Sequence, residues 1–352
     1  MKLESTIKAI RPLCSQSMQQ AKDYFSSIAI PLGSLGHLQD AIIQIAGIQQ
    51  CAHPQISKRS VAVFCADNGV VAQGVTQCGQ EVTAIVTENL SRGQTSVCRM
   101  AEHTGVRVLP VDIGVACDVT GEHILSKKIA YGTKDMSQQP AMTHAECVKA
   151  LETGIEIAEL CKNNGDTLVA VGEMGIGNTT SSAAVTAVLT GKSPTETTGY
   201  GAGLSNAGLA RKIATIEQAI AVNQPNPEDP IDVLAKVGGF DLAGITGFYL
   251  GAAAQRLPII ADGVITAAAA LSAVRICPTV RDYILFSHQS SEPASKILLQ
   301  VLRAQPFISA QMHLGEGTGA VAAIALLDLA FAVYNEMPSF ADIAMEAYQP
   351  LI

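Results

Sequence analysis

Five short, almost wholly apolar runs are spaced along the chain, and helical stretches lie between them. Successive positions within each run are apolar, so both faces of the run must be covered, as in a parallel sheet with helices on either side. Strand followed by helix, repeated, predicts βαβ units and a doubly wound α/β fold with a mostly parallel sheet. The predicted strands are residues 60–66, 106–113, 167–171, 257–261 and 282–286.

The two ends of the chain show no strand pattern and read as helical. We therefore expect residues 1–30 and 326–352 to pack together as a small helical subdomain beside a large α/β domain of residues 31–325. The run 223–230 (NQPNPEDP) predicts a surface turn between two helices, the second beginning near Ile231. The predicted helices are residues 144–163, 180–190, 205–223, 241–255, 263–275 and 293–304.

Composition excludes several classes of protein. The chain has 23 Lys and Arg against 31 Asp and Glu, a net charge of −8, whereas a protein that grips a nucleic-acid backbone needs a basic surface. The nine cysteines form no C-x-x-C pair, so we expect no metal site, no disulfide framework and a reducing, cytoplasmic location. The N-terminus is charged and has no apolar core, so we do not expect it to act as a signal peptide. Asp262 and Asp328 interrupt the most apolar stretches, so no membrane span is expected.

Glycines and polar residues follow every predicted strand. Ligands of open α/β sheets bind beyond the carboxyl ends of the strands, so these clusters predict a single site. The clusters are 67–70 (DNGV), 112–114 (DIG), 172–180 (GEMGIGNTT), 262–263 (DG) and 287–292 (SHQSSE).

The segment 172–180 combines three glycines with a Thr-rich start of a helix. Glycines let the backbone approach an anion, and the free N–H groups of the helix start can bind phosphate. The alternative is a tight turn that needs positive φ and caps its helix. The segment is neither G-x-G-x-x-G nor a P-loop, so neither a nicotinamide dehydrogenase nor a nucleoside triphosphatase is supported. The candidate phosphate-binding residues are Gly175, Ile176, Gly177, Asn178, Thr179 and Thr180.

Glycines bracket one carboxylate in the segment 314–320 (LGEGTGA), just before a long apolar helix. They leave Glu316 uncovered by neighbouring side chains, so it can face a pocket as a base. The alternative is an ordinary first-turn Glu that complements the helix dipole. Glu173, in the glycine-rich segment, is a candidate second carboxylate. Two carboxylates near one pocket can divide the roles of base and electrostatic stabiliser.

Other polar side chains allow two interpretations. Lys212 lies in a basic pair on a predicted helix, and a solvated pair is the simpler interpretation. Ser290 and Ser291 can donate to phosphate or ribose hydroxyls, whereas His288 fits a structural role. Asp112 and Asp262 lie at strand ends. Each can either bind ribose hydroxyls or cap the turn that follows it, and the sequence leaves both roles open.

Eight segments together resemble one family closely and in the same order along the chain. They are 31–36 (PLGSLG), 64–70 (FCADNGV), 172–180 (GEMGIGNTT), 223–227 (NQPNP), 237–247 (VGGFDLAGITG), 257–263 (LPIIADG), 287–292 (SHQSSE) and 314–319 (LGEGTG). The family is nicotinate-nucleotide–dimethylbenzimidazole phosphoribosyltransferase, and the resemblance runs nearly end to end.

The resemblance implies a Rossmann-like sheet, a small helical domain from both termini and a homodimer. It also implies transfer of 5-phosphoribose from nicotinate mononucleotide to 5,6-dimethylbenzimidazole in cobalamin biosynthesis. The products would be nicotinate and α-ribazole 5′-phosphate, formed with inversion at the anomeric carbon. No metal or organic cofactor is implied.

The resemblance also implies roles for individual residues. Glu316 matches the family's catalytic base and Glu173 its second active-site carboxylate. The nucleotide-binding positions match Gly175–Thr180, Lys212, Ser290 and Ser291. The pocket for the aromatic base matches Cys78, Gly79, Val86 and Leu314.

Two segments depart from the family pattern. Asn68 stands where the family commonly has a His, so no acid–base role is available at that position. Many members have Ser-Pro or Tyr-Pro where this chain has Cys78 and Gly79, and some have Gln at the position of Val86. The base therefore stays open between dimethylbenzimidazole, another benzimidazole and a purine. A non-catalytic nucleotide-binding protein of the same fold is a further alternative, against which the exposed setting of Glu316 argues.

Overall fold

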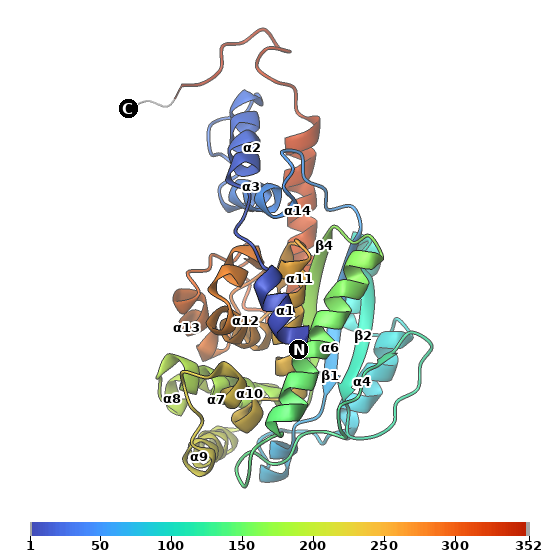
Figure 1. The fold of residues 1–352 in the computed structure, drawn as a ribbon, viewed down its shortest axis with the longest axis vertical. Helices are drawn as coiled ribbons and strands as arrows, with labels where there is room; N and C mark the ends of the chain where they lie inside the picture. Colours follow the sequence, from blue (N-terminus) through green and yellow to red (C-terminus); the bar gives the residue numbers. More distant parts are fainter. Residues whose placement is uncertain (1, 350–352) are drawn as a thin grey trace.

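The computed structural model describes residues 2–349, and a six-stranded parallel sheet lies at its centre (Figure 1). The strand order is β3-β2-β1-β4-β5-β6, and every neighbouring pair is parallel. This is the strand order of the Rossmann fold. The strands are β1 (Arg59–Ala66), β2 (Arg107–Gly114), β3 (Leu125–Ser126), β4 (Leu168–Met174), β5 (Ile259–Ala261) and β6 (Ile284–Phe286).

All five predicted strands are confirmed, and so is the doubly wound α/β class. Strand β3 was not predicted, because two residues at the edge of a sheet carry no periodic pattern. Strand β4 runs to Met174, so Gly172 and Glu173 belong to the strand and not to the loop that the sequence suggested.

Helices cover both faces of the sheet, and the six internal helices predicted are present within three residues of their expected bounds. The C-terminal segment 326–352 was expected to be helical, but helix ends at Glu336 and residues 337–349 form turns and coil, since Pro338 cannot continue a helix. The helices at residues 37–49, 81–91, 96–104 and 194–197 had not been predicted. The α-helices are α1 (Lys2–Ala9), α2 (Ser15–Ser27), α3 (His37–Gln49), α4 (Glu81–Ser91), α5 (Ser96–Thr104), α6 (His144–Asn163), α7 (Asn178–Thr190), α8 (Pro194–Thr197), α9 (Asn206–Asn223), α10 (Pro230–Val237), α11 (Phe240–Ala254), α12 (Val264–Ile276), α13 (Pro293–Val301) and α14 (Thr318–Glu336), with 3₁₀ turns at Gly69–Gln73 and Pro278–Tyr283.

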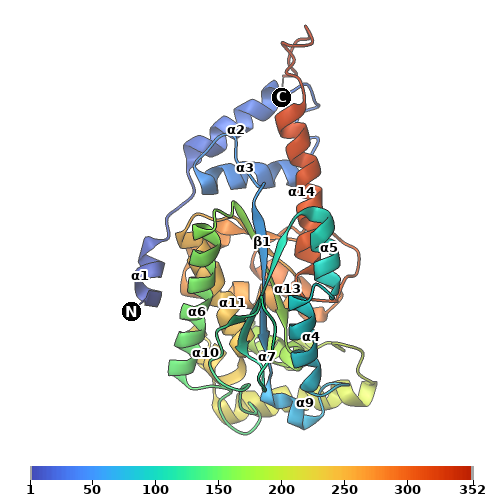
Figure 2. The same cartoon turned by 90° about the vertical axis from the view of Figure 1, so that its right-hand side faces the viewer.

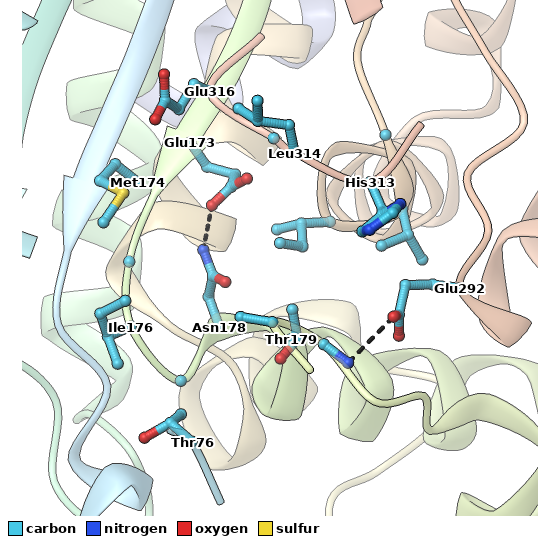
Figure 3. Close-up of a pocket in the computed structure, with 18 of the residues that line it drawn as sticks. Thr76, Glu173, Met174, Ile176, Asn178, Thr179, Glu292, His313, Leu314 and Glu316 are labelled. Atoms are coloured by element: carbon cyan, nitrogen blue, oxygen red, sulfur yellow. Dashed lines mark hydrogen bonds between the residues drawn. The ribbon is translucent and has the colours of Figure 1, made fainter. Parts of the chain in front are cut away.

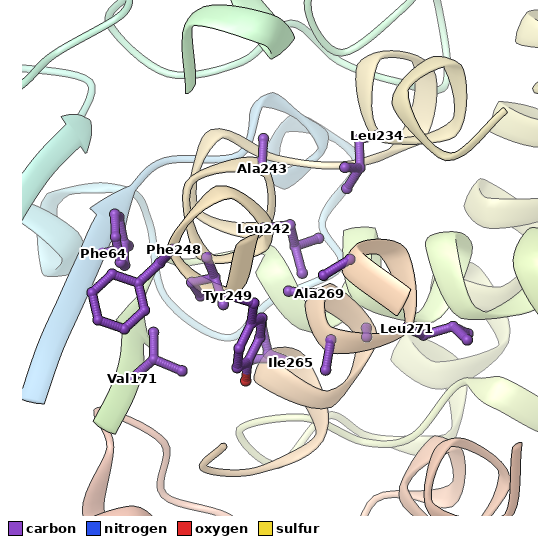
Figure 4. Packing of buried hydrophobic residues seen from close by; sticks show 14 of the residues in the cluster. Phe64, Val171, Leu234, Leu242, Ala243, Phe248, Tyr249, Ile265, Ala269 and Leu271 are labelled. Atoms are coloured by element: carbon purple, nitrogen blue, oxygen red, sulfur yellow. The ribbon is translucent and has the colours of Figure 1, made fainter. Parts of the chain in front are cut away.

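Alternate residues of β1 point into two separate cores. Val61 and Val63 face the helices α2–α5 and α14, whereas Ala62 and Phe64 face α6, α11 and α12. Figure 4 shows Phe64 against Phe248 of α11, with ring centroids 5.9 Å apart. Burial on both faces explains why the strands are apolar at successive positions.

The ends of the chain lie in two places. Helices α2 and α3 pack together beside α14, at the end of the molecule opposite α9 (Figure 2). Helix α1 instead packs against α6 and α11, and α14 passes residue 326 without a break. The division into residues 31–325 and two terminal segments therefore stays a prediction. Among residues 2–349, only α14 is long and apolar enough to cross a membrane, and 56% of its apolar window is buried inside the protein.

A substitution in α11 tests how closely two helices approach. A Cβ at Gly247 would lie 1.9 Å from the backbone oxygen of Leu151 in α6. Gly247→Ala must push the helices apart, so we expect the free energy of unfolding to fall by about 1–3 kcal/mol. Gly208→Ala in α9 is the control, because its Cβ would meet Leu204 side-chain atoms at 3.0 Å and Ala favours helix. Urea unfolding measures both, and equal stabilities would contradict the prediction.

Candidate active site

A pocket of about 450 Å³ opens at the carboxyl ends of the central strands. Strands β1 and β4 are neighbours there although β2 follows β1 in sequence, so the chain leaves them toward opposite sides. Such a switch point is where open α/β sheets bind ligands. The pocket has the size of small-molecule sites in general.

Most of the predicted site residues line this one pocket. They come from five separate segments of the chain, which the fold brings together: Cys78, Val86, Glu173, Gly175, Ile176, Gly177, Asn178, Thr179, Lys212, Ser290, Leu314 and Glu316.

Three predicted residues do not line the pocket. Thr180 is fully buried in the first turn of α7, and its hydroxyl has no hydrogen-bond partner among residues 2–349. Ser291 is exposed, and its backbone N–H donates to the Met312 oxygen at 3.3 Å. Gly79 lies just outside the lining next to Cys78. Roles for these three residues in binding stay predictions.

The glycine-rich turn and Lys212 form one polar end of the pocket. Gly177, with φ of 95°, immediately precedes α7. The N–H groups of Asn178 and Thr180 donate to the oxygens of Gly175 and Gly177 at 3.1 and 2.9 Å, so of these first three N–H groups that of Thr179 is the one left without a partner among residues 2–349. The Nζ of Lys212 donates to Thr179 Oγ1 at 2.8 Å. Lys212 is fully buried, so the interpretation as a solvated basic pair was wrong. Burial lowers the pKa of Lys212 to about 8, so the ammonium is still mostly charged at neutral pH and can meet an anion inside the pocket.

An unusual turn carries Glu316 at the other end of the pocket. Gly315, Glu316 and Gly317 have φ of 88°, 60° and 91°, and a left-handed conformation strains a residue that has a Cβ. A Cβ at Gly172 would lie 2.4 Å from the carbonyl carbon of Glu316, so the turn packs directly on β4. This contact brings Glu316 next to Glu173, as Figure 3 shows.

The two carboxylates have different surroundings. Burial raises the pKa of Glu316, whereas the Val97 N–H and the Thr95 hydroxyl lower it. Its buried Oε2 has no hydrogen-bond partner among residues 2–349 and can accept a proton. Burial raises the pKa of Glu173 to about 8, despite a hydrogen bond from the amide of Asn178. Glu173 is therefore mostly protonated at neutral pH.

Asp241 is part of this network and was missed in the sequence. The Nδ2 of Asn178 donates to Asp241 Oδ2 at 3.0 Å as well as to Glu173, so one amide joins two buried carboxyls. The only local signal was an Asp after Gly-Gly at the start of a helix. Tyr200 and His313 are among the further lining residues that the sequence had not singled out, whereas Glu292 belongs to the predicted cluster 287–292.

The hydrogen bonds of the two carboxylates at strand ends support their role as caps. Asp262 accepts from the N–H groups of Gly317 and Ala320 at 3.1 and 3.0 Å, so it caps α14. Asp112 accepts from the Val115 N–H at 3.0 Å and pairs with Lys128 at 2.9 Å. Both carboxylates stabilise turns, and since Asp262 also lines the pocket, its binding of a ribose hydroxyl stays a prediction.

Three buried carboxyls predict how stability depends on pH. Burial raises the pKa of Glu173 to about 8, of Asp262 to about 7 and of Asp241 to about 6. In the unfolded chain these pKa values are about 4, so from about pH 5 to 8 the folded protein binds more protons than the unfolded chain. The free energy of unfolding should therefore fall as pH rises over this range.

Asp241→Asn tests this prediction, since it removes one of the three groups and still offers Asn178 an acceptor. Urea unfolding of both proteins at pH 5, 6, 7 and 8 gives the slopes. We expect a shallower fall in the variant. Identical slopes would show that Asp241 takes up no proton on folding.

Comparisons with known proteins identify relatives over the full length of the chain. A family model described as phosphoribosyltransferase matches residues 10–344. The nicotinate-nucleotide–dimethylbenzimidazole phosphoribosyltransferase of Ruminiclostridium cellulolyticum is 46% identical over 351 residues, which cover 100% of both chains. The protein of the same name from Acetivibrio thermocellus is 45% identical over 99% of this chain and 100% of its own.

Solved structures give the same result for the fold. The crystal structure of CobT from Thermus thermophilus has a TM-score of 0.90 at 35% identity, and the match covers 95% of this chain and 100% of that one. Sequence likeness over the full length thus coincides with likeness of fold. The chain belongs to the nicotinate-nucleotide–dimethylbenzimidazole phosphoribosyltransferase family.

Proposed function

We propose that this protein moves 5-phosphoribose from nicotinate mononucleotide to 5,6-dimethylbenzimidazole, in the synthesis of cobalamin. One observation carries the proposal: a single pocket has a buried lysine and a glycine-rich helix start at one end and two carboxyls at the other. The first end suits a phosphate, and the second suits an aromatic base with an N–H group. The relatives named above bear this activity in their names.

In the proposed reaction, one ring nitrogen of the base attacks the anomeric carbon while Glu316 takes the proton of the other. Its raised pKa makes it a better base than an ordinary carboxylate. Attack from the side opposite the departing nicotinate inverts the anomeric carbon and gives α-ribazole 5′-phosphate. A protonated Glu173 avoids placing a second negative charge beside Glu316 and the anionic nucleotide.

Release of nicotinate tests the proposal. Nicotinate mononucleotide is mixed with dimethylbenzimidazole, with adenine or with no base, and nicotinate and products are separated by chromatography. Release that depends on dimethylbenzimidazole and yields a ribazole phosphate supports the proposal. Release with adenine alone would change the substrate. Binding without release, with any base, would favour a non-catalytic nucleotide-binding protein.

The base pocket contains the departure from the family pattern. Cys78 and Val86 line the pocket, and Gly79 adjoins it. The three atoms nearest to a Cβ at Gly79 all belong to the movable carboxylate of Glu81, so a side chain at this position would displace a flexible group and not backbone. We expect the double change Cys78→Ser, Gly79→Pro to raise the preference for dimethylbenzimidazole over adenine, measured as the ratio of kcat/KM values. Val222→Ser, at an exposed site on α9, serves as control. An unchanged ratio would show that this segment does not select the base.

A homodimer and a cytoplasmic location complete the proposal. Five exposed apolar side chains lie on α14 and the segment after it, which extends from the body of the molecule in Figure 1. Exposed apolar groups gathered in this way are typical of protein interfaces, and a second copy of the chain is the partner that we propose. The five are Leu329, Met337, Ile343, Met345 and Tyr348. All nine cysteines are unpaired, which suits a reducing compartment.

A further inference from the structure

His288 lies in the pocket but has no part in the proposed chemistry. It is 5% exposed, and its ring lies against the starts of two helices. A Cβ at Gly319 would lie 2.0 Å from its Nδ1, and a Cβ at Gly263 would lie 3.4 Å from its Nε2. The backbone around His288 is also held in place, because the Gln289 N–H donates a hydrogen bond to the Ile308 oxygen at 3.0 Å. The ring therefore has one fixed position.

A chain of hydrogen bonds sets the tautomer of this ring. The hydroxyl of Ser287 donates to the backbone oxygen of Asp262 at 2.7 Å, because a carbonyl can only accept. The same hydroxyl lies 3.0 Å from Nδ1 of His288. Its single proton is already used, so Nδ1 must carry a proton and donate to Ser287. Burial lowers the pKa of His288, which keeps the ring neutral.

The other ring nitrogen, Nε2, is then an acceptor. No residue between 2 and 349 donates to it, and the ring lines the pocket. Its lone pair would repel a phosphate oxygen or the carboxylate of nicotinate. A hydroxyl group of the substrate is the donor that fits.

The place of His288 indicates which part of the substrate it meets. On one side, the segment that follows His288 reaches the phosphate end: Glu292 accepts from the Gly201 N–H at 3.1 Å, and a Cβ at Gly201 would lie 3.3 Å from Nζ of Lys212. On the other side, the ring lies against Gly319 in the first turn of α14, which directly follows the turn that carries Glu316. His288 therefore lies between the phosphate end and the end where the base binds. In a mononucleotide, the ribose occupies that middle position.

We infer that His288 accepts, through Nε2, a hydrogen bond from a ribose hydroxyl of the bound mononucleotide, and that Ser287 holds the ring in the tautomer this requires. The inference rests on the proposed function for the identity of the nucleotide. His288 is a positioning residue in this role, because it aligns the sugar and does not touch the reacting atoms. It selects ribonucleotides over deoxyribonucleotides.

The test combines variants with altered substrates. Wild type, His288→Leu, His288→Gln and Ser287→Ala are mixed with nicotinate mononucleotide and with its 2′-deoxy and 3′-deoxy forms. Calorimetry without base gives affinity, and nicotinate release with dimethylbenzimidazole gives kcat/KM. In wild type, loss of the correct hydroxyl should weaken binding about tenfold. His288→Leu should weaken binding of the natural nucleotide about as much, and loss of that hydroxyl should then have no further effect.

The other variants separate this contact from a structural effect. His288→Gln keeps an acceptor and should retain most of the dependence on the hydroxyl, whereas Ser287→Ala should reduce it. His313→Leu is the control, because His313 is an exposed histidine in the same pocket. Its fold-change in nucleotide affinity should multiply with the fold-change caused by either deoxy substrate, as expected for independent effects. If His288→Leu and the loss of either hydroxyl weakened nucleotide binding independently, so that their fold-changes in affinity multiplied, the inference would be overturned, even with normal nicotinate release. Coupled binding without any nicotinate release would uphold the inference and overturn the proposed function.

Discussion

Glu316→Gln is expected to lower kcat by about 10²- to 10⁴-fold, because an amide cannot take a proton from the attacking base. Gln has nearly the same size, so the affinity for nicotinate mononucleotide should stay close to that of wild type. The structure provides the reason: Oε2 of Glu316 is buried without a partner among residues 2–349, and burial raises the pKa. Steady-state release of nicotinate gives kcat, and calorimetry without base gives affinity.

Glu173→Gln is the matched control for this experiment. With a pKa of about 8, Glu173 is mostly protonated at pH 7, and an amide resembles that neutral form. We expect a smaller loss of kcat, about tenfold or less at pH 7. Near-normal turnover of Glu316→Gln would remove Glu316 from its role as base. Equal large losses in both variants would assign proton transfer to the pair of carboxyls.

Lys212→Met is expected to weaken binding of nicotinate mononucleotide on the order of 10²-fold, because a charge-assisted hydrogen bond to the phosphate is lost. Among residues 2–349, Lys212 is the only Lys or Arg that lines the pocket. Thr179 and the Gly199 oxygen hold its Nζ at 2.8 and 3.4 Å, so the charge is positioned before the ligand arrives. Calorimetry with the nucleotide alone measures the effect.

Arg211→Met is the control for Lys212, since Arg211 is the adjacent cation on α9. It is exposed and donates to the Gly74 oxygen at 2.9 Å, so its loss should change nucleotide affinity little. Thermal unfolding adds a second criterion. Met in place of a buried charge should leave the ligand-free protein as stable as wild type or more so. Equal affinities of the two variants would mean that Lys212 does not hold the phosphate.

Much of the fold could be predicted because the signals are local. The bounds of α6, His144–Asn163, equal the predicted range, since apolar spacing and the Thr143–Glu146 capping box both lie in neighbouring residues. Strand β3 has only two residues and depends on its pairing with β2. No pattern within the segment itself indicates it.

The candidate site was predictable in outline for a related reason. Glycines and polar residues at strand ends mark the edge of a parallel sheet, and Glu173 and Glu316 were identified by their glycine neighbours. Lys212 was misinterpreted because a lysine on a helix is expected to be solvent-exposed. Only the fold shows which face of that helix packs against the rest of the protein. Asp241 was missed because its partner is in another helix.

By itself, the sequence determined five of the six strands, most helices, the family and the segments that meet at the site, because these follow from residues close together in the chain. Only the tertiary structure decided the burial of Lys212, the protonation of Glu173 and the tautomer of His288. Desolvation and hydrogen bonding set those properties, and each depends at least in part on groups distant in sequence, such as the Asp262 oxygen that takes the proton of Ser287. Asn178 and Asp241 are 63 residues apart, yet one amide proton donor joins them at 3.0 Å.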